Sequence, residues 1–235
     1  DYFTINVACD PGQKAASYQT RENITKILEP LFEFRRGQNQ YRPILLKVSP
    51  DLSDETIDLM TDIMLDTPLD GMVAVNATVS REGVDRLEAT RIGAGVVSGQ
   101  PLTQRALEVV RRIHTRSGGN FPIIGVGGIM TPDDAKAMLD AGADLLQLYT
   151  GYIYNGPGLV RDICRALVAD AEAKAAAQAT AEQPAVQQAA AEQPAKEQPA
   201  PQSAETQPEA ENAEPAPAES RTPAQSGPDS EQPES

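Results

Sequence analysis

The first 170 residues alternate between short apolar runs and segments with helical spacing, and this pattern constrains the fold more than any other feature. Each of five β-rich runs precedes a stretch in which apolar residues recur every three or four positions. The runs are apolar at nearly every position, which is typical of parallel strands buried on both faces. We expect strands at 2–7, 43–49, 69–75, 121–126 and 145–149, and helices at 21–36, 54–64, 103–116, 131–141 and 158–168.

Repeated strand–helix units predict an α/β fold with a parallel sheet. Five such units fit either a doubly wound sheet or part of an eight-stranded barrel, and the pattern alone leaves both open. In both arrangements the chemistry belongs at the carboxyl ends of the strands. The polar residues that follow the strands are therefore the candidates for a functional site.

The composition changes sharply after residue 170. Residues 171–235 contain 10 of the 19 prolines, 12 acidic residues and 3 basic ones, no aromatic residue, and Val186 as their only branched aliphatic residue. A segment with so little apolar surface cannot offset its conformational entropy. We therefore predict a folded domain at 1–170 and a disordered acidic tail at 171–235. The alanines of 171–180 favour an extension of the last helix, and recurring prolines are expected to break it beyond Gln183.

Charge and residue types exclude several functions. The tail and the preceding 170 residues are both acidic, which argues against non-specific nucleic-acid binding. No apolar run is long enough for a transmembrane helix. Cys9 and Cys164 lie far apart in sequence, and His114 is the only histidine, so neither a disulfide framework nor a multi-histidine metal site is expected. His114 falls on a basic helix face, where we expect it to be solvated.

Lys47 is the polar residue that is hardest to explain structurally. It interrupts an apolar strand, so it must either extend to the surface or meet a negative partner. Asparagines that follow strands are more often turn formers than ligands, and a lone cysteine is usually a small buried hydrophobe. A glycine pair before a helix is usually a tight turn as well. The run GVGG at 125–128 would nevertheless let backbone N–H groups approach a phosphate, with the helix start at 131–134 adding a favourable dipole. Together with Lys47, this run predicts a phosphorylated cofactor.

Five strings in this order resemble those of dihydroorotate dehydrogenases, and in detail those of the quinone-dependent class. The resemblance covers roughly residues 1–169. It implies a (β/α)₈ barrel that holds FMN and oxidises dihydroorotate to orotate in pyrimidine synthesis, with a quinone as electron acceptor. This chain would supply about the last five βα units. The strings are LLKVSPDLS (45–53), VNATVSR (75–81), VSGQPL (97–102), PIIGVGGI (122–129) and QLYTGYIYNGPGL (147–159).

The resemblance also implies a role for each matching position. Cys9 takes the place of the catalytic base, where the quinone class usually has serine and the soluble class cysteine. Asn6 would contact both the flavin and the substrate, and Asn76 with Ala77 would form the substrate-binding pair, which is usually Asn-Thr. The implied flavin contacts are Asn6, Lys47, Val75, Gly99, Gly128, Tyr149 and Thr150, and no metal is implied.

The sequence also departs from the family. After the first strand it reads Asn6-Val7-Ala8-Cys9-Asp10-Pro11, where the family typically has Asn-x-Ser-(Ser or Cys)-Pro-Asn. Pro11 therefore lacks a substrate-binding amide, and Asp10 adds a negative charge near an anionic substrate.

The first three βα units of the barrel are missing from this sequence, so we expect them to lie upstream. The resemblance also implies N-terminal helices that form a quinone tunnel, and hence a cytoplasmic protein held peripherally at the membrane. Three hypotheses remain: part of an active dihydroorotate dehydrogenase, another FMN- or phosphate-binding barrel enzyme, or a degenerate chain without catalysis.

Overall fold

The structure is a computed structural model that describes residues 1–8 and 19–191. In that part of the chain, five parallel strands form one sheet in the sequential order β1-β2-β3-β4-β5. The prediction of a parallel α/β fold is therefore confirmed. The strands are β1 (Phe3–Asn6), β2 (Ile44–Val48), β3 (Gly71–Ala74), β4 (Ile123–Val126) and β5 (Leu145–Gln147).

The five expected helices are present, and two of them, those that begin at Asp54 and Pro132, are capped as their sequences suggest. The Ser53 hydroxyl accepts a hydrogen bond from the N–H of Thr56, and Thr131 and Asp134 form a reciprocal capping box. Pro30 lies inside a single uninterrupted helix. The helices are α2 (Arg21–Arg36), α3 (Asp54–Asp66), α5 (Thr103–Ser117), α6 (Pro132–Asp140) and α8 (Gly158–Ala191).

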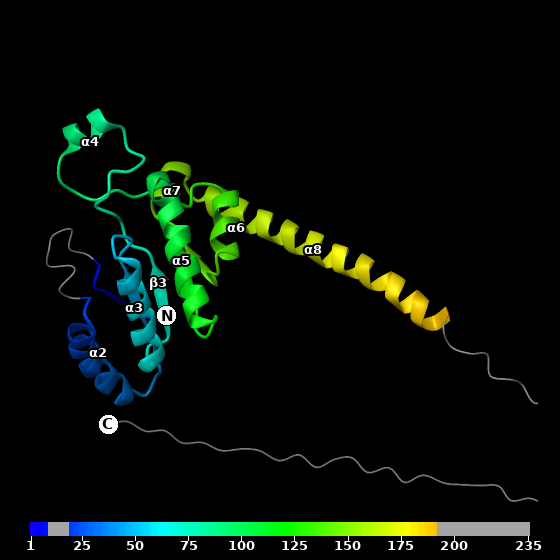
Figure 1. The fold of residues 1–235 in the computed structure, drawn as a ribbon, viewed down its shortest axis with the longest axis horizontal. Helices are drawn as coiled ribbons and strands as arrows, with labels where there is room; N and C mark the ends of the chain where they lie inside the picture. Colours follow the sequence, from blue (N-terminus) through cyan, green and yellow to red (C-terminus); the bar gives the residue numbers. More distant parts are fainter. Residues whose placement is uncertain (9–18, 192–235) are drawn as a thin grey trace, which may run out of the picture. The chain divides into compact units, whose positions relative to one another are not determined.

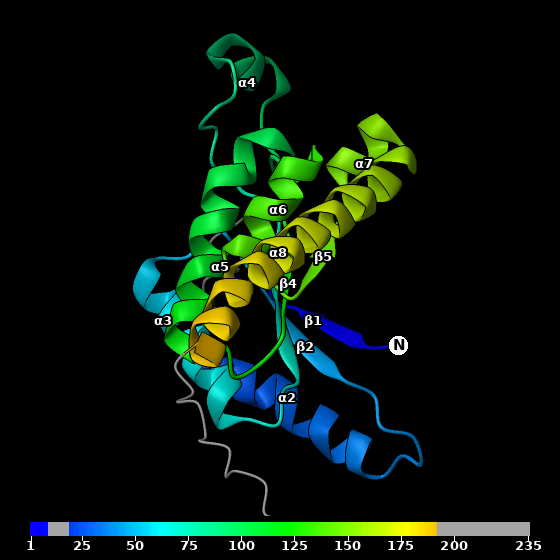
Figure 2. The same cartoon turned by 90° about the vertical axis from the view of Figure 1, so that its right-hand side faces the viewer.

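Three short helical elements were not predicted. The polar segment between β3 and α5 contains α4 (Arg86–Ile92) and the 3₁₀ turn η1 (Gln100–Leu102), and α7 (Thr150–Asn155) follows β5. Their few apolar residues gave no clear helical spacing. Figure 1 and Figure 2 both show α4 standing apart from the helices that cover the sheet.

The helices cover one face of the sheet. Ile44, Leu46 and Val48 of β2 belong to a large core that includes residues of α2, α3, α5 and α6. The intervening residues form a separate small cluster of Leu45, Val73, Ile124 and Val126. Figure 1 shows α2, α3, α5 and α6 side by side in chain order. A doubly wound sheet has helices on both faces and a reversal of strand order, so the described arrangement is that of a barrel segment.

The two edge strands differ from the inner ones. Every residue of β3 and β4 is buried, whereas β1 and β5 are largely exposed. Phe3 on β1 is 58% exposed, and Leu145 on β5 is 57% exposed. Edge strands with exposed apolar side chains are usually covered or paired in a finished fold.

Helix α8 extends further than the sequence suggested. Leu159 and Ile163 pack against the core, whereas residues 171–179 are all exposed. The helix continues past Pro184 to Ala191, so the predicted break beyond Gln183 is wrong. Proline removes only one helical donor, and the surrounding alanine and glutamine residues favour helix. Residues 192–235 of the tail lie outside the described residues, so their disorder stays a prediction. No helix of the described part is both long and apolar enough to cross a membrane.

Candidate functional site

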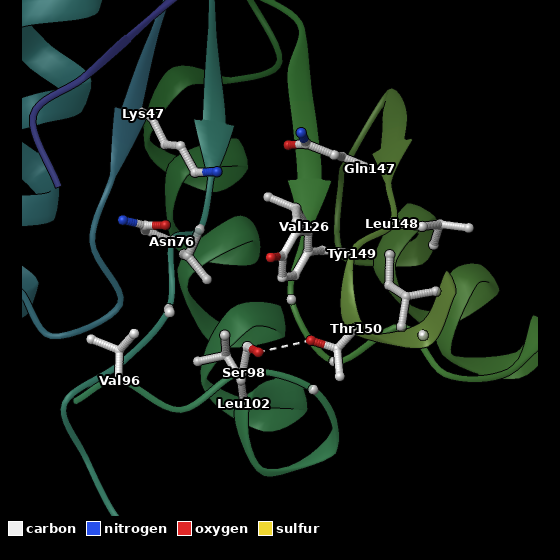
Figure 3. A pocket seen from close by; sticks show the side chains of 17 residues that line it. Lys47, Asn76, Val96, Ser98, Leu102, Val126, Gln147, Leu148, Tyr149 and Thr150 are labelled. Atoms are coloured by element: carbon white, nitrogen blue, oxygen red, sulfur yellow. Dashed lines mark hydrogen bonds between the residues drawn. The ribbon is translucent and has the colours of Figure 1, made fainter. Parts of the chain in front are cut away.

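A cavity of about 350 Å³ lies at the carboxyl ends of β2 to β5. Figure 3 shows it seen from close by. This is where ligands bind in parallel α/β folds. Its lining includes eight of the ten residues that the sequence singled out, namely Lys47, Val75, Asn76, Ala77, Gly99, Gly128, Tyr149 and Thr150.

The other two predicted residues are placed differently. Asn6 is aligned with Lys47 in the sheet, but it is not part of the cavity lining. Its side-chain oxygen accepts a hydrogen bond of 3.1 Å from the N–H of Ala8. Cys9, with Asp10 and Pro11, lies outside the described residues.

Lys47 faces the cavity. It alternates with Leu46 and Val48, which belong to the helix-covered core, so its side chain is directed to the opposite face of the sheet. Figure 3 shows the Lys47 amine and the Gln147 amide projecting into the same space from β2 and β5. An amine at this position can attract an anionic or electron-rich ligand group.

Asn76 ties three strand ends together. Its N–H donates to the carbonyl oxygen of Val48 over 3.0 Å, and its side-chain nitrogen donates to the carbonyl oxygen of Ala8 over 2.7 Å. Both peptide groups of Ala8 are thus held, one by Asn6 and one by Asn76. This arrangement fixes the point from which the chain leaves β1 toward Cys9.

The second part of the cavity is built from three connections that are tied to one another. The Thr103 hydroxyl lies within hydrogen-bond distance of the carbonyl oxygens of Gln100 (2.9 Å) and Gly128 (3.0 Å), which share its single proton. The side-chain nitrogen of Asn155 donates to the carbonyl oxygen of Met130 over 3.2 Å. We use the term cradle for these tied segments, residues 98–103, 127–130 and 149–155.

Gly128 and Gly99 are required by the shape of the cradle. Both have positive φ, of 74° and 84°. A Cβ at Gly128 would lie 2.6 Å from the backbone nitrogen of Thr103, and one at Gly99 would lie 2.8 Å from the Thr150 Cγ2. Only a bare backbone fits at these two positions, and a bare backbone is what brings N–H groups close to a phosphate.

Helix α6, which follows GVGG, does not direct its first N–H groups into the cavity as expected. The N–H groups of Met130 and Thr131 donate to the Asp134 carboxylate over 3.0 and 2.9 Å. No residue of 131–134 lines the cavity. The prediction of a helix dipole from 131–134 is therefore wrong, because Asp134 caps that helix itself. Instead, η1 and α7 begin at the cavity wall.

Several cavity residues were not predicted from the sequence. Ser98 and Thr150 bring their hydroxyl oxygens within 2.7 Å of each other across the cavity (Figure 3). Ser98 lies in the string VSGQPL (97–102). Side chains alternate along β5, so Gln147 could have been expected on the face of the sheet that lines the cavity. The other lining residues that the sequence did not single out are Val96, Leu102, Ile129, Leu148 and Gly151, whereas Val126 and Gly127 belong to the GVGG run.

The cavity therefore combines a polar end with apolar walls. The cradle offers glycine backbone and two hydroxyls, which suit a phosphate. Val75, Leu102, Val126 and Ile129 offer apolar surface, and Lys47 adds a cation beyond them. These residues fit a ligand with a phosphate at one end and a planar, electron-rich group at the other.

Comparisons with known proteins agree with this geometry. The family model "Dihydroorotate dehydrogenase" matches residues 1–170. A dihydroorotate dehydrogenase (quinone) from Thermosynechococcus vestitus is 44% identical over 178 residues, which cover 73% of this chain and 48% of that protein. One from Corynebacterium efficiens is 44% identical over 165 residues, covering 69% of this chain and 42% of that protein.

Among solved structures, the dihydroorotate dehydrogenase of Eimeria tenella in complex with ferulenol matches with a TM-score of 0.65 and 27% identity. The match covers 71% of this chain and 49% of that one. The chain thus spans about half the length of the relatives it matches. On the family match, the relatives and the shared fold, the chain belongs to the dihydroorotate dehydrogenase family.

Proposed function

We propose that this chain forms the cofactor-phosphate side, and part of the substrate side, of an FMN-dependent dihydroorotate dehydrogenase with a quinone as electron acceptor. The observation that carries the proposal is the cavity itself. It gathers eight residues at the positions that the family resemblance assigns to flavin and substrate, from the ends of four strands and the connections that follow them.

The cradle would hold the flavin phosphate. Gly99, Gly128, Tyr149 and Thr150 surround the space where backbone and hydroxyl groups converge. The backbone of Val75 and the side chain of Lys47 would border the flavin ring. There the lysine charge favours the anionic reduced ring in a site from which water is excluded.

The substrate side would use the strand ends of β1 and β3. Asn6 and Asn76 would contact dihydroorotate, in addition to holding Ala8. Cys9 would take a proton from C5 of the substrate. Bound FMN would supply the acceptor for the hydride that leaves C6. Ala77 stands where the family usually has threonine, so it can offer the substrate its backbone and no hydroxyl.

A complete active site would need a second set of βα units. β1 and β5 both leave an edge of the sheet unpaired within the described residues, so one side of a flavin ring bound here would face water until further strands close the barrel. We propose that such units supply the rest of the flavin site, the quinone tunnel and the peripheral contact with the cytoplasmic membrane.

Complementation tests this function. The chain is coexpressed with the segment of the Thermosynechococcus vestitus relative that it does not match, and the purified pair is loaded with FMN. We expect dihydroorotate to bleach the flavin absorbance and a soluble quinone to restore it. Exchanging Lys47 for methionine should keep the fold and slow the bleaching. A pair that binds FMN and never bleaches with dihydroorotate would refute the proposed activity.

A further inference from the structure

Gln147 of β5 has no role in the proposed function, yet it is unusual on the inner face of the sheet, the face turned away from the helices. It is aligned with Val126, which belongs to the small cluster on that face. Along the described strands β2 to β5, Lys47 is the only other polar residue on the inner face. The remaining inner-face positions of these strands are Leu45, Gly71, Val73, Ile124, Val126 and Leu145.

The two polar side chains reach the same end of the cavity. Both line it, although β2 and β5 are separated by two strands. Figure 3 shows the Lys47 amine and the Gln147 amide at the end of the cavity that lies away from the hydroxyls of Ser98 and Thr150. A ligand whose phosphate is held by the cradle would therefore extend its other end toward both groups.

The Gln147 amide is placed where a polar group needs a partner. Its neighbours on the inner face are apolar, and within the described residues no hydrogen bond holds its side chain. A polar group that loses water without gaining a hydrogen bond costs free energy. A ligand that fills this end of the cavity would thus be expected to supply the partner.

An amide and an ammonium group recognise different ligand groups. The ammonium of Lys47 only donates hydrogen bonds, whereas the amide of Gln147 both donates and accepts. The pyrimidine edge of a flavin ring alternates acceptors and a donor, in the order C2=O, N3–H and C4=O. A neutral amide beside one lysine suits such a ring edge better than it suits a second anion, which calls for donors alone.

We propose that Gln147 is a flavin-contacting residue, whose amide hydrogen-bonds the pyrimidine edge of the ring beside Lys47 and raises the reduction potential of the flavin. The inference rests on the proposed function in taking FMN as the ligand. The amide N–H donates more strongly to the anionic reduced ring than to the neutral oxidised ring, because a hydrogen bond to a charged acceptor is the stronger one.

The reduction potential of bound FMN tests the proposal. The barrel is completed by coexpression as above and loaded with FMN, and the flavin is reduced with dithionite beside a dye of known potential. Gln147→Met removes the amide at similar length and should make reduction about tenfold less favourable, since a hydrogen bond to a charged group is lost. For a two-electron couple this is a fall of about 30 mV.

Gln147→Glu sharpens the test, because it keeps the shape and introduces a negative charge. A carboxylate opposes the anionic reduced ring, so the potential should fall further than in Gln147→Met. Gln104→Glu is the matched control. It makes the same charge change at an exposed glutamine of α5 that lines a different cavity, and it should leave the potential close to the parent value.

The side chain of Gln147 is exposed in the described chain, so the exchanges remove no core packing. Loss of FMN from both Gln147 variants at an unchanged unfolding temperature would also support a contact with the ring. Loss of FMN together with a lower unfolding temperature would make Gln147 a structural residue and overturn the proposal.

Two further results would overturn it. The first is an equal flavin potential in the parent, Gln147→Met and Gln147→Glu. The second is a fall in Gln104→Glu as large as that in Gln147→Glu, which would mean that only the net charge matters. Dihydroorotate is not used, so a barrel that shows the expected potentials and never bleaches with dihydroorotate would refute the proposed activity and leave this inference standing. A parent barrel that binds no FMN would refute both.

Discussion

The two sides of the cavity are built in different ways. On the cradle side, three connections hold one another through side-chain hydrogen bonds. Two of them follow the buried strands β3 and β4, and the third follows the edge strand β5. On the substrate side, Asn6 and Asn76 hold Ala8, but Asn6 belongs to an edge strand that is largely exposed. We therefore expect a half-barrel to form most of the proposed phosphate site, whereas its proposed substrate site depends on strands from outside it.

The largest effect is expected on the substrate side, at Cys9. In a barrel completed as above, Cys9→Ala should slow flavin reduction by dihydroorotate about 10²–10⁴-fold, which is typical for a positioned general base. Stopped-flow bleaching of the flavin measures this rate. FMN content should stay unchanged, because Cys9 is not part of the cradle.

Two further variants sharpen this prediction. Cys9→Ser should keep partial activity and shift the pH profile, since a serine hydroxyl is a far weaker acid than a thiol. Replacing Asp10-Pro11 by Pro-Asn should tighten orotate binding, because it removes a like charge and restores an amide. A Cys9→Ala rate within a few-fold of the parent would make Cys9 a packing residue.

The next effect belongs to the cradle, at Gly128. Gly128→Ala should lower the free energy of unfolding by about 3 kcal/mol, since it combines a left-handed backbone with overlap against Thr103. Phosphate binding should be lost as well. Gly156→Ala is the matched control, with φ of 67° and nothing within 4 Å of the added Cβ, and it should cost only about 1 kcal/mol. Urea unfolding measures the free energy of unfolding of both variants. Equal losses of stability would show that Thr103 can move away from the added Cβ.

A smaller effect on stability is expected from the ion pairs between α3 and α5. Arg112 forms a bidentate ion pair with Asp58, at 2.7 Å for both bonds, and Arg116 does the same with Asp62 at 2.8 and 2.7 Å. These arginines lower the pKa of the Asp58 and Asp62 carboxyls below their ordinary value, mainly through the side-chain hydrogen bonds.

The ion pairs should therefore contribute stability above about pH 4 and lose it as the pH falls through the lowered pKa values. Asp58→Asn should cost about 1 kcal/mol at pH 7, because the pair is partly exposed, and should flatten the acid limb of stability. Glu88→Gln on α4, which breaks an exposed pair with Arg91, should cost less. Phosphate binding should be the same in both variants. An Asp58→Asn chain that loses phosphate affinity would mean that the two sides are coupled through these helices.

The strands and main helices could be predicted from the sequence better than the contacts within the site. Near-continuous apolar runs and capped amphipathic segments made the strands and the main helices visible, since local pattern decides both. Lys47 could be singled out because a cation inside an apolar strand must either reach the surface or meet a negative partner. The pairing of Ser98 with Thr150 could not, because two hydroxyls that are far apart in sequence carry no local signal.

The helix start at 131–134 is instructive in another way. The sequence showed a glycine run followed by a helix, a combination that is usually a tight turn and can also bind an anion. It also showed Asp134 in the first turn, and only the structure reveals that this carboxylate takes the N–H groups for itself. A capping box and an anion site compete for the same donors, and here the capping box uses them.

The most direct measurement is the affinity of FMN for the isolated chain and for the chain completed with the missing half of a relative. If the isolated chain forms the phosphate site but leaves the flavin ring exposed to water, it should bind FMN about as weakly as inorganic phosphate. Closure should tighten FMN at least about 100-fold, because the ring then loses its contact with water. A yellow isolated chain that purifies with stoichiometric FMN would contradict this account.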